Sequence, residues 1–307
     1  MIFATLVWID EKNLKHDNNK SNSIFSYLRQ ARLLAKSLHQ EIGKNLCILT
    51  NRPEICNQFF SEKTSWQPLI IETPASISPP DGIKFYSAHH KLSALAKILE
   101  LLKIDSDDRF FLLDSDIYVN KALSASQIFA LSSADLTVYN ISDQVFPVYG
   151  GQRISNEIDF ITKSKITDPQ WFGGEFLSGN SKGLSCLIEK ANDLIPTYFE
   201  NHEKLHHLGD EMYISCAINT LRQDSDIKIN TANNYYFCSR HWSRHTDRPL
   251  SWHFKHSFIH CPGSKPVLEI FSKTLPISTR SMKTALALYQ VFVITYQIFK
   301  KIAKRQN

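Results

Sequence analysis

The sequence predicts an α/β protein in which a mostly parallel, Rossmann-like central sheet is flanked by helices. Two observations predict this class. Apolar runs of strand length alternate with helical periodicity in the first half of the chain, and residues 109–113 form a very apolar run that is typical of a central strand covered on both faces. No internal repeat, low-complexity tract or Gly/Ser linker interrupts the 307 residues. We therefore expect one α/β domain over residues 1–270 and an appendage at residues 271–307.

The predicted elements follow this alternation along the chain. Residues 2–9 are apolar and form a buried first strand. A helix follows, because the apolar residues from Phe25 to Leu38 recur at helical spacing and Ser21 to Ser23 can cap it. The next expected elements are strands at 45–50 and 68–72, a loop at 79–82, a helix at 87–103, and strands at 109–113 and 134–139.

The second half of the chain shows weaker periodicity. Residues 140–170 are polar and aperiodic, which predicts long loops over one end of the sheet. Helices are expected at 184–195 and 211–221, and a strand at 227–230. An aromatic, His-rich stretch then runs to Pro266.

Composition narrows the class of protein. A chain with 43% hydrophobic and 21% charged residues is expected to fold and not to be disordered. The six cysteines have no short paired spacing such as CxxC, and several lie in apolar runs, which favours buried reduced thiols over disulfides or a zinc site. The first strand carries no basic segment before it and is too short to span a bilayer, so the chain is expected to start in the cytoplasm.

The net charge of +5 comes from the C-terminal tail. No acidic residue follows Glu269, whereas seven basic residues do, and without them the chain has 28 basic against 30 acidic residues. This distribution argues against a nucleic-acid groove in the body. Residues 285–299 are almost wholly apolar and precede basic residues, which predicts either an interfacial helix on an anionic membrane or a helix packed on the body. The first alternative implies a peripheral protein at the inner face of the membrane.

Two aspartates follow the apolar run that ends at residue 113. Ligands of open α/β sheets bind at the carboxyl ends of strands, so Asp114 and Asp116, on either side of Ser115, are placed to hold one hard cation. Such a cation can bridge a pyrophosphate and neutralise a departing nucleotide diphosphate. The alternatives are a turn in which the aspartates cap backbone amides, and a phosphatase in which the first aspartate is the nucleophile and the second the general acid.

With its neighbouring motifs, this element resembles the A-type glycosyltransferases. The resemblance is to the retaining, family 8-like group that contains glycogenin and the bacterial lipopolysaccharide galactosyl- and glucosyltransferases. The run from Leu113 to Val119 matches the LDADxxV element of that family, and Ser115 occupies its central position. Lys91 resembles the basic residue on the preceding helix, which in the family faces the phosphates of the nucleotide sugar. The resemblance implies the A-type glycosyltransferase fold.

A motif near the end of the predicted domain supports the resemblance. His260, Gly263 and Lys265 resemble the HxxGxxKP element, although one residue fewer separates the glycine from the lysine. The resemblance implies that His260 is the third ligand of Mn²⁺ or Mg²⁺, beside the two aspartates. It also implies that Gly263 and Lys265 contact the diphosphate. Taken alone, His260 is equally consistent with a structural histidine.

Two further segments resemble the sugar site of these enzymes. In Trp171-Phe172-Gly173-Gly174, the glycines would let a sugar ring lie against the backbone and Trp171 or Phe172 would pack on an acceptor, with a core turn as the alternative. Asp210 and Glu211, at the predicted start of a helix, resemble the acidic pair beneath the donor anomeric carbon. Ordinary helix capping explains this acidic pair equally well. The resemblance implies that Asp210 binds donor hydroxyls and that Glu211 is a stabiliser or nucleophile, with Glu175 as the competing carboxylate.

The function that the resemblance implies is retaining transfer of a hexose from a nucleotide sugar, with a UDP-sugar favoured, to a saccharide or lipid-linked glycan in polysaccharide biosynthesis. Thr5, Trp8 and Tyr27 are expected to meet the nucleobase and ribose, and residues 140–170 and 235–256 the acceptor. The open alternatives are a phosphatase or nucleotidyltransferase that uses the aspartates, and a non-catalytic carbohydrate-binding protein. A nucleotidyltransferase normally carries a Gly-rich loop after its first strand, which this sequence lacks.

Overall fold

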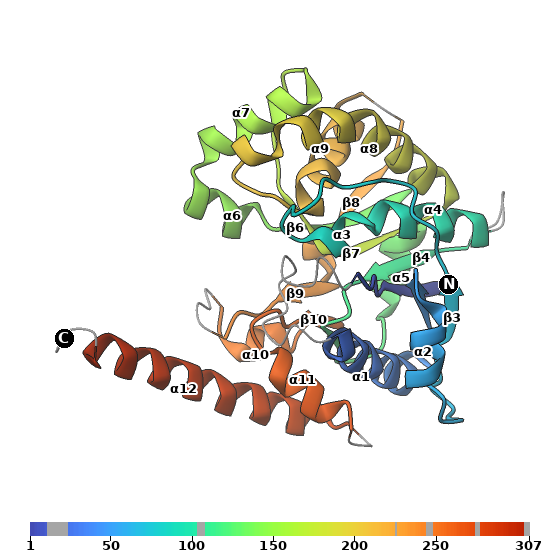
Figure 1. The fold of residues 1–307 in the computed structure, drawn as a ribbon, viewed down its shortest axis with the longest axis vertical. Helices are drawn as coiled ribbons and strands as arrows, with labels where there is room; N and C mark the ends of the chain where they lie inside the picture. The colour runs from blue at the N-terminus through green and yellow to red at the C-terminus, as the bar shows by residue number, and fades with distance from the viewer. Residues whose placement is uncertain (11–23, 103–107, 225, 244–247, 274–276, 304–307) are drawn as a thin grey trace.

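The computed structural model describes residues 1–10, 24–102, 108–224, 226–243, 248–273 and 277–303. The described chain forms one α/β body, from which the last helix projects (Figure 1). The predicted cap at Ser21 to Ser23 lies outside the described residues, as do the tail residues Lys304 and Arg305.

A seven-stranded sheet crosses the body. In spatial order its strands are β3 (Leu69–Glu72), β2 (Leu46–Thr50), β1 (Ile2–Leu6), β4 (Phe110–Leu113), β7 (Phe172–Gly179), β6 (Leu136–Asn140) and β8 (Ile229–Thr231). The pairs β3–β2, β2–β1, β1–β4 and β6–β8 are parallel, whereas β7 is antiparallel to both of its neighbours. The predicted mostly parallel sheet is therefore confirmed, with one antiparallel strand in its interior.

Apolar side chains pack the three central strands β1, β4 and β7 together. All four residues of β4 are buried, as expected for a strand covered on both faces. The ring of Phe111 stacks on that of Phe3 in β1, with 4.4 Å between the centroids, and Phe176 of β7 meets Phe111 edge-on. Because β1 and β4 are parallel neighbours, their carboxyl ends lie at the same edge of the sheet.

Helices cover both faces of the sheet (Figure 1). On one face lie α4 (Lys91–Leu101), α7 (Gly151–Thr162), α8 (Ser181–Asn201) and α9 (Asp210–Asp224). On the other lie α1 (Ile24–Ile42), α2 (Pro53–Phe59) and α11 (Lys265–Phe271). The remaining helices are α3 (Tyr86–His89), α5 (Ala125–Ser132), α6 (Ser142–Tyr149), α10 (Leu250–His253) and α12 (Thr279–Ala303), with short 3₁₀ turns at His202–Lys204 and Ala232–Tyr235.

A second, three-stranded sheet was not predicted and organises the end of the chain. Its strands are β5 (Ile117–Val119), β10 (Phe258–His260) and β9 (Cys238–Arg240), with β10 in the middle. β10 runs antiparallel to β5 and parallel to β9, and this register pairs His260 with both Ile117 and Arg240. The small sheet thus places His260 between Ile117, the residue after Asp116, and Arg240.

The prediction of long loops over residues 140–170 is wrong, because α6 and α7 occupy most of this segment. Ile154, Ile158 and Ile161 of α7 are fully buried at helical spacing, and they pack against α9. These three isoleucines at helical spacing form one apolar face, and the prediction missed the helix because the segment as a whole is polar. Likewise, Phe172–Gly179 is an entirely buried strand and not a turn.

The six cysteines are free, and four of them are buried, as predicted. Cys47 lies in β2, where burial raises the pKa of its thiol above the usual range. Burial likewise raises the pKa of the Cys216 and Cys261 thiols. These thiols are small apolar side chains of the core.

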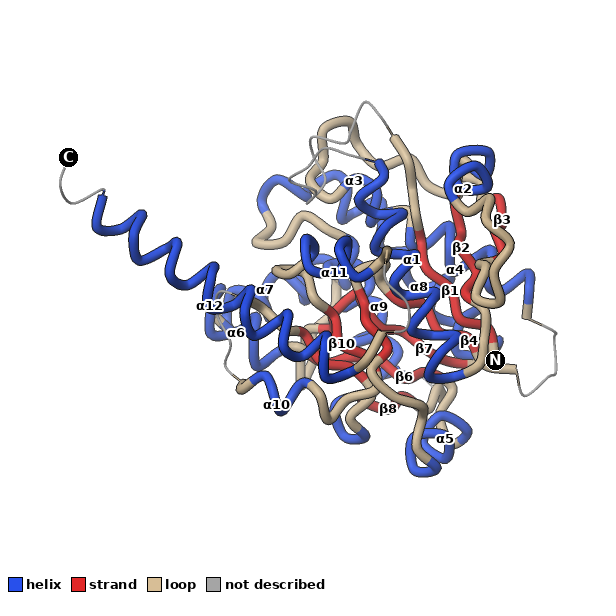
Figure 2. The backbone as a smooth tube through the Cα atoms, turned by 90° about the horizontal axis from the view of Figure 1, so that it is seen from below, coloured by secondary structure: helices blue, strands red, loops and turns tan. Residues whose placement is uncertain are grey.

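Helix α12 divides into a packed and an exposed half. Met282 and Leu286 are fully buried in an apolar cluster with Tyr118 and Ile259 of the small sheet. The second half leaves the body, as Figures 1 and 2 both show. Its exposed apolar side chains are Leu288, Val291, Phe292, Ile294, Tyr296, Ile298 and Phe299. Of the helices in the described ranges, none combines the length and apolarity needed to cross a bilayer.

Candidate functional site

Three side chains from three strand ends form a candidate metal centre. Asp114 follows β4, Asp116 precedes β5, and His260 is the last residue of β10. A tight turn joins the first two, because the Ile117 N–H donates to the Asp114 carbonyl at 3.2 Å. The Cys261 N–H donates to the Asp116 carbonyl at 3.0 Å, which holds β10 against this turn.

The distances in this cluster suit one cation. His260 Nε2 lies 3.0 Å from Asp116 Oδ1 and 3.8 Å from Asp114 Oδ2. One potential ligand atom from each residue lies within 4.8 Å of the other two. Two carboxylates and an imidazole are donors that a divalent ion such as Mn²⁺ accepts, and the 28% exposure of the Asp114 side chain leaves the cluster open on one side. The residues therefore fit the predicted metal.

The charges of the cluster are strongly coupled. Burial would raise the pKa of Asp116, but His260 and Lys265 outweigh it and hold that pKa well below its usual range. Lys265 Nζ lies 3.4 Å from Asp116 Oδ2. Burial would also lower the pKa of His260, but Asp116 and Glu175 raise it to about 9. The carboxylates of Asp116 and Glu175 therefore favour the protonated imidazole.

Lys91 connects this centre to the start of α9. Its Nζ lies 2.8 Å from Asp114 Oδ1 and 2.8 Å from Asp210 Oδ2, and it donates to the Gly174 carbonyl at 2.9 Å. Burial would lower the pKa of Lys91, but the two carboxylates raise it, so the ammonium stays charged. The pKa of Asp210 is raised, with burial as the main cause. The predicted Lys91, Asp114 and Asp210 are thus brought together.

An arginine that was not predicted joins the other two acidic candidates. Arg240 ends β9, and its Nε donates to Glu175 Oε1 at 2.6 Å and its Nη2 to Glu175 Oε2 at 2.5 Å. The same Nη2 donates to Glu211 Oε1 at 2.6 Å. Burial would raise the pKa of both glutamates, but Arg240 lowers it, so both are anionic. No motif marks Arg240 in the sequence, because only the unpredicted pairing of β9 with β10 places it beside His260.

Gly173 and Gly174 allow these charged groups to approach the backbone of β7. A Cβ on Gly174 would lie 2.3 Å from Asp210 Oδ2 and 2.7 Å from Lys91 Nζ. A Cβ on Gly173 would lie 2.0 Å from Glu175 Oε2. The space above both glycines is therefore occupied by the charged side chains of the protein itself.

The remaining predicted residues lie around this centre. Trp171 is fully buried, and it reaches the site through its indole N–H, which donates to Glu211 Oε2 at 3.0 Å. Thr5 is buried in β1, and the ring of Trp8 stacks on His90 with 3.6 Å between centroids. The Tyr27 ring lies 5.4 Å below Lys265 Nζ. Ser115 is buried in the turn, and a Cβ on Gly263 would lie 3.0 Å from the Ser243 nitrogen.

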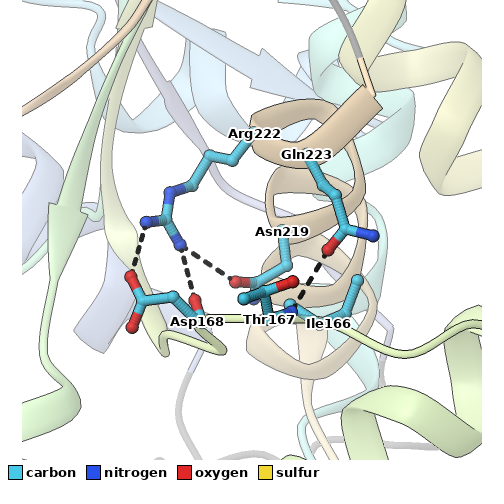
Figure 3. A pocket seen from close by; sticks show the side chains of 6 residues that line it. All are labelled: Ile166, Thr167, Asp168, Asn219, Arg222 and Gln223. Carbon is cyan, nitrogen blue, oxygen red and sulfur yellow. Dashed lines mark hydrogen bonds and ion pairs between the residues drawn. The ribbon is translucent and has the colours of Figure 1, made fainter.

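A separate surface cavity of about 120 Å³ lies at the other end of α9 (Figure 3). Its polar groups bond to one another: Arg222 Nη2 donates to Asp168 Oδ2 at 3.0 Å, and the Thr167 N–H donates to Gln223 Oε1 at 3.2 Å. It contains none of the predicted site residues. Because α9 rises about 1.5 Å per residue, roughly 14 Å separate Asn219 on its wall from Asp210.

Comparison with known proteins places the fold. No family model matches the sequence, and no curated protein does. Among solved structures, the chain is similar to mouse xyloside xylosyltransferase 1 in its apo form, with a TM-score of 0.50 and 14% identity over 85% of this chain and 97% of that one. It is also similar to the galactosyltransferase LgtC in complex with donor and acceptor sugar analogs, with a TM-score of 0.49 and 15% identity over 92% of this chain and 100% of the other. The likeness to the xylosyltransferase confirms the A-type glycosyltransferase fold.

Proposed function

We propose that this protein is a metal-dependent glycosyltransferase, which moves a hexose from a nucleotide diphosphate sugar to a hydroxyl of a saccharide or lipid-linked glycan. The observation that carries the proposal is the cluster of Asp114, Asp116 and His260 at the carboxyl edge of the sheet. Open α/β sheets bind their ligands at this edge, and Lys265 places a further positive charge beside the cluster. The xylosyltransferase fold supports the same reaction class.

The side chains divide the work of such a reaction. A divalent cation, Mn²⁺ or Mg²⁺, would neutralise the diphosphate that leaves the donor. Lys265 stabilises the same negative charge, and Gly263 lets the backbone approach the phosphates. Thr5, Trp8 and Tyr27 line the side of the nucleoside, with UDP as the favoured nucleotide.

The acidic residues at the start of α9 face the sugar in this proposal. Lys91 orients Asp210 for contacts with donor hydroxyls. Glu211 stabilises positive charge at the anomeric carbon, because its side chain is 15% exposed whereas that of Glu175 is fully buried. With Glu211 beneath the ring, the departing phosphate would take the acceptor proton, so that transfer with retention of configuration needs no strong protein base.

A thermal-shift experiment with UDP and MnCl₂ tests the proposal. The two together are expected to raise the melting temperature of the wild type, and Asp116→Asn should abolish the rise because it removes a charged ligand. Asp168→Asn, in the surface cavity, is the matched control and should respond as the wild type does. The proposal is wrong if the Asp116→Asn protein still binds UDP in a Mn²⁺-dependent way. Hydrolysis of p-nitrophenyl phosphate by the wild type would instead favour the phosphatase alternative.

We also propose that α12 attaches the protein to an anionic membrane surface. Seven apolar side chains of its second half are exposed, and Lys300 and Lys301 follow them within the same helix. Apolar area together with basic charge is the combination that binds peripheral helices to anionic lipid. A cytoplasmic enzyme held there would meet lipid-linked acceptors.

Vesicle co-sedimentation tests the attachment. A truncation that ends at Tyr289 keeps the packed residues Met282 and Leu286, so the body should stay folded while binding to phosphatidylglycerol vesicles is lost. Lys300→Gln with Lys301→Gln should weaken binding to these vesicles about 25-fold, since each basic residue near the surface contributes about 1 kcal/mol. Equal binding by the truncated and full-length proteins would eliminate the proposal.

A further inference from the structure

The buried carboxylate of Glu175 lies between the metal centre and Arg240. Its Oε1 faces His260 Nδ1 at 3.3 Å, on the side of the imidazole opposite to the nitrogen that faces the aspartates. Both oxygens also accept from the guanidinium of Arg240. Glu175 is therefore part of a chain of contacts that runs from the metal centre into the protein.

The contacts of Glu175 exclude a direct role with substrate. The side chain is fully buried, and both of its oxygens are held by the planar fork of one guanidinium. Paired hydrogen bonds of this kind fix the plane of a carboxylate as well as its position. A carboxylate so fixed cannot swing towards a sugar, but it presents Oε1 to His260 in one orientation.

The group that Glu175 faces is the Nδ1 nitrogen of His260. Within the described part of the chain, its buried Nδ1 makes no hydrogen bond of good geometry, so Glu175 Oε1 at 3.3 Å is the acceptor in position to take it. A histidine that ligates a metal through one ring nitrogen usually donates the other N–H to a carboxylate, carbonyl or water, which fixes the tautomer and the ring orientation. The position of Glu175 Oε1, 3.3 Å from Nδ1, corresponds to that of the acceptor in such a pair.

We propose that Glu175 and Arg240 are positioning residues, which orient His260 so that Nε2 faces the metal. This inference rests on the proposed metal site. Arg240 also donates to Glu211 Oε1 at 2.6 Å, so one guanidinium sets the position of a metal ligand and of the carboxylate beneath the sugar. Glu175 and Arg240 act through His260 and Glu211 and touch neither metal nor donor.

The chain supplies a matched control for this arrangement. Glu157 of α7 also joins a histidine ring to an arginine, with Oε2 at His206 Nδ1 and Oε1 accepting from Arg153 Nε at 2.8 Å. This second trio includes no candidate metal ligand. Glu157→Gln therefore reports what the loss of such a carboxylate does to the protein in general, and Glu175→Gln reports the additional effect at the metal.

The test is Mn²⁺ binding measured by the EPR signal of the free ion, without nucleotide sugar. Glu175→Gln is expected to weaken Mn²⁺ binding about 10–100-fold, the usual effect of losing such a partner, whereas Glu157→Gln leaves it unchanged. In the background of His260→Ala, Glu175→Gln should have no further effect, because the residue through which it acts is absent. Circular dichroism melting shows that each variant is folded.

Each outcome decides the inference. Equal Mn²⁺ affinity for the wild type and Glu175→Gln, or the same loss with and without His260, overturns it while the proposed function stands. If the wild type binds no Mn²⁺, the proposed metal site itself fails. If Glu175→Gln does not fold, Arg240→Lys decides instead, because it keeps the charge but cannot hold both oxygens. It should weaken Mn²⁺ binding several-fold, and an unchanged affinity would refute the inference.

Discussion

Replacing Lys91 by methionine is the sharpest perturbation of the acidic centre. Methionine has a similar length but no charge, so the substitution leaves Asp210 buried, with a side chain that is 7% exposed, and without its cation. Removing one partner of a buried ion pair costs about 3–5 kcal/mol. With an unfolding entropy of about 2.1 cal/mol/K per residue, a loss of that size lowers the melting temperature by roughly 5–8 °C in a chain of this length.

The effect should also depend on pH. Without Lys91, the folded-state pKa of Asp210 rises further above its unfolded value of about 3.9. A raised folded pKa means that stability is present at low pH and is lost as the pH rises through that pKa. The deficit of Lys91→Met against wild type should therefore be full at pH 7 and small near pH 4. Lys91→Met with Asp210→Asn should recover part of it at pH 7.

Urea unfolding at pH 7 and pH 4 measures the loss of unfolding free energy in Lys91→Met and the dependence of this loss on pH. Lys97→Met is the matched control on the same helix, since the partner of Lys97 is Glu100, with a side chain that is 63% exposed. Exposed pairs contribute about 0.2–1 kcal/mol, so this variant should lose no more than that. The reasoning fails if Lys91→Met loses as little as Lys97→Met, or if Asp210→Asn restores nothing.

Two further perturbations test the same region. Gly174→Ala should lower the melting temperature and abolish the Mn²⁺-dependent UDP shift, because the new Cβ would lie 2.3 Å from Asp210 Oδ2. The control Gly151→Ala meets only ordinary contacts at 3.5 Å or more and should be neutral. Equal behaviour of the two variants would contradict the structure. In EDTA, the raised pKa of His260, about 9, should give stability that is present below pH 6.5 and lost as the pH rises through 9, worth up to about 3 kcal/mol. Denaturant unfolding of His260→Gln should lack this slope, and an identical slope would show that another group titrates.

Local sequence patterns predicted the elements whose apolar residues are consecutive or evenly spaced. Residues 110–113 became β4 and the residues after Phe25 became α1, because burial on two faces or on one stripe leaves a direct trace in the sequence. Phe172–Gly179 left no such trace, since its glycines and Glu175 serve a buried ionic network. A strand whose buried residues include glycines and a charged side chain lacks the apolar run by which buried strands are predicted.

The site divides in the same way. Asp114 and Asp116 could be predicted because two carboxylates directly follow a buried strand, whereas His260 was predicted only through the resemblance of residues 260–265 to a family element. Arg240 could not, because its role depends on the register of β9 with β10 and on a carboxylate from β7. Long-range pairing of short strands sets these contacts, and a single sequence contains no local signal for it.

The balance of charge in the centre argues for a divalent cation independently of any resemblance. Among the described residues, its acidic side chains are Asp114, Asp116, Glu175, Asp210 and Glu211, and its permanent cations are Lys91, Arg240 and Lys265. The five carboxyl groups thus exceed the three cations by two, and a proton on His260 reduces the difference to one. A buried charge without a partner costs several kcal/mol. An ion of charge +2 that displaces the His260 proton offsets the whole difference of two charges. A monovalent ion that displaces the same proton leaves one negative charge unbalanced, as the proton itself did.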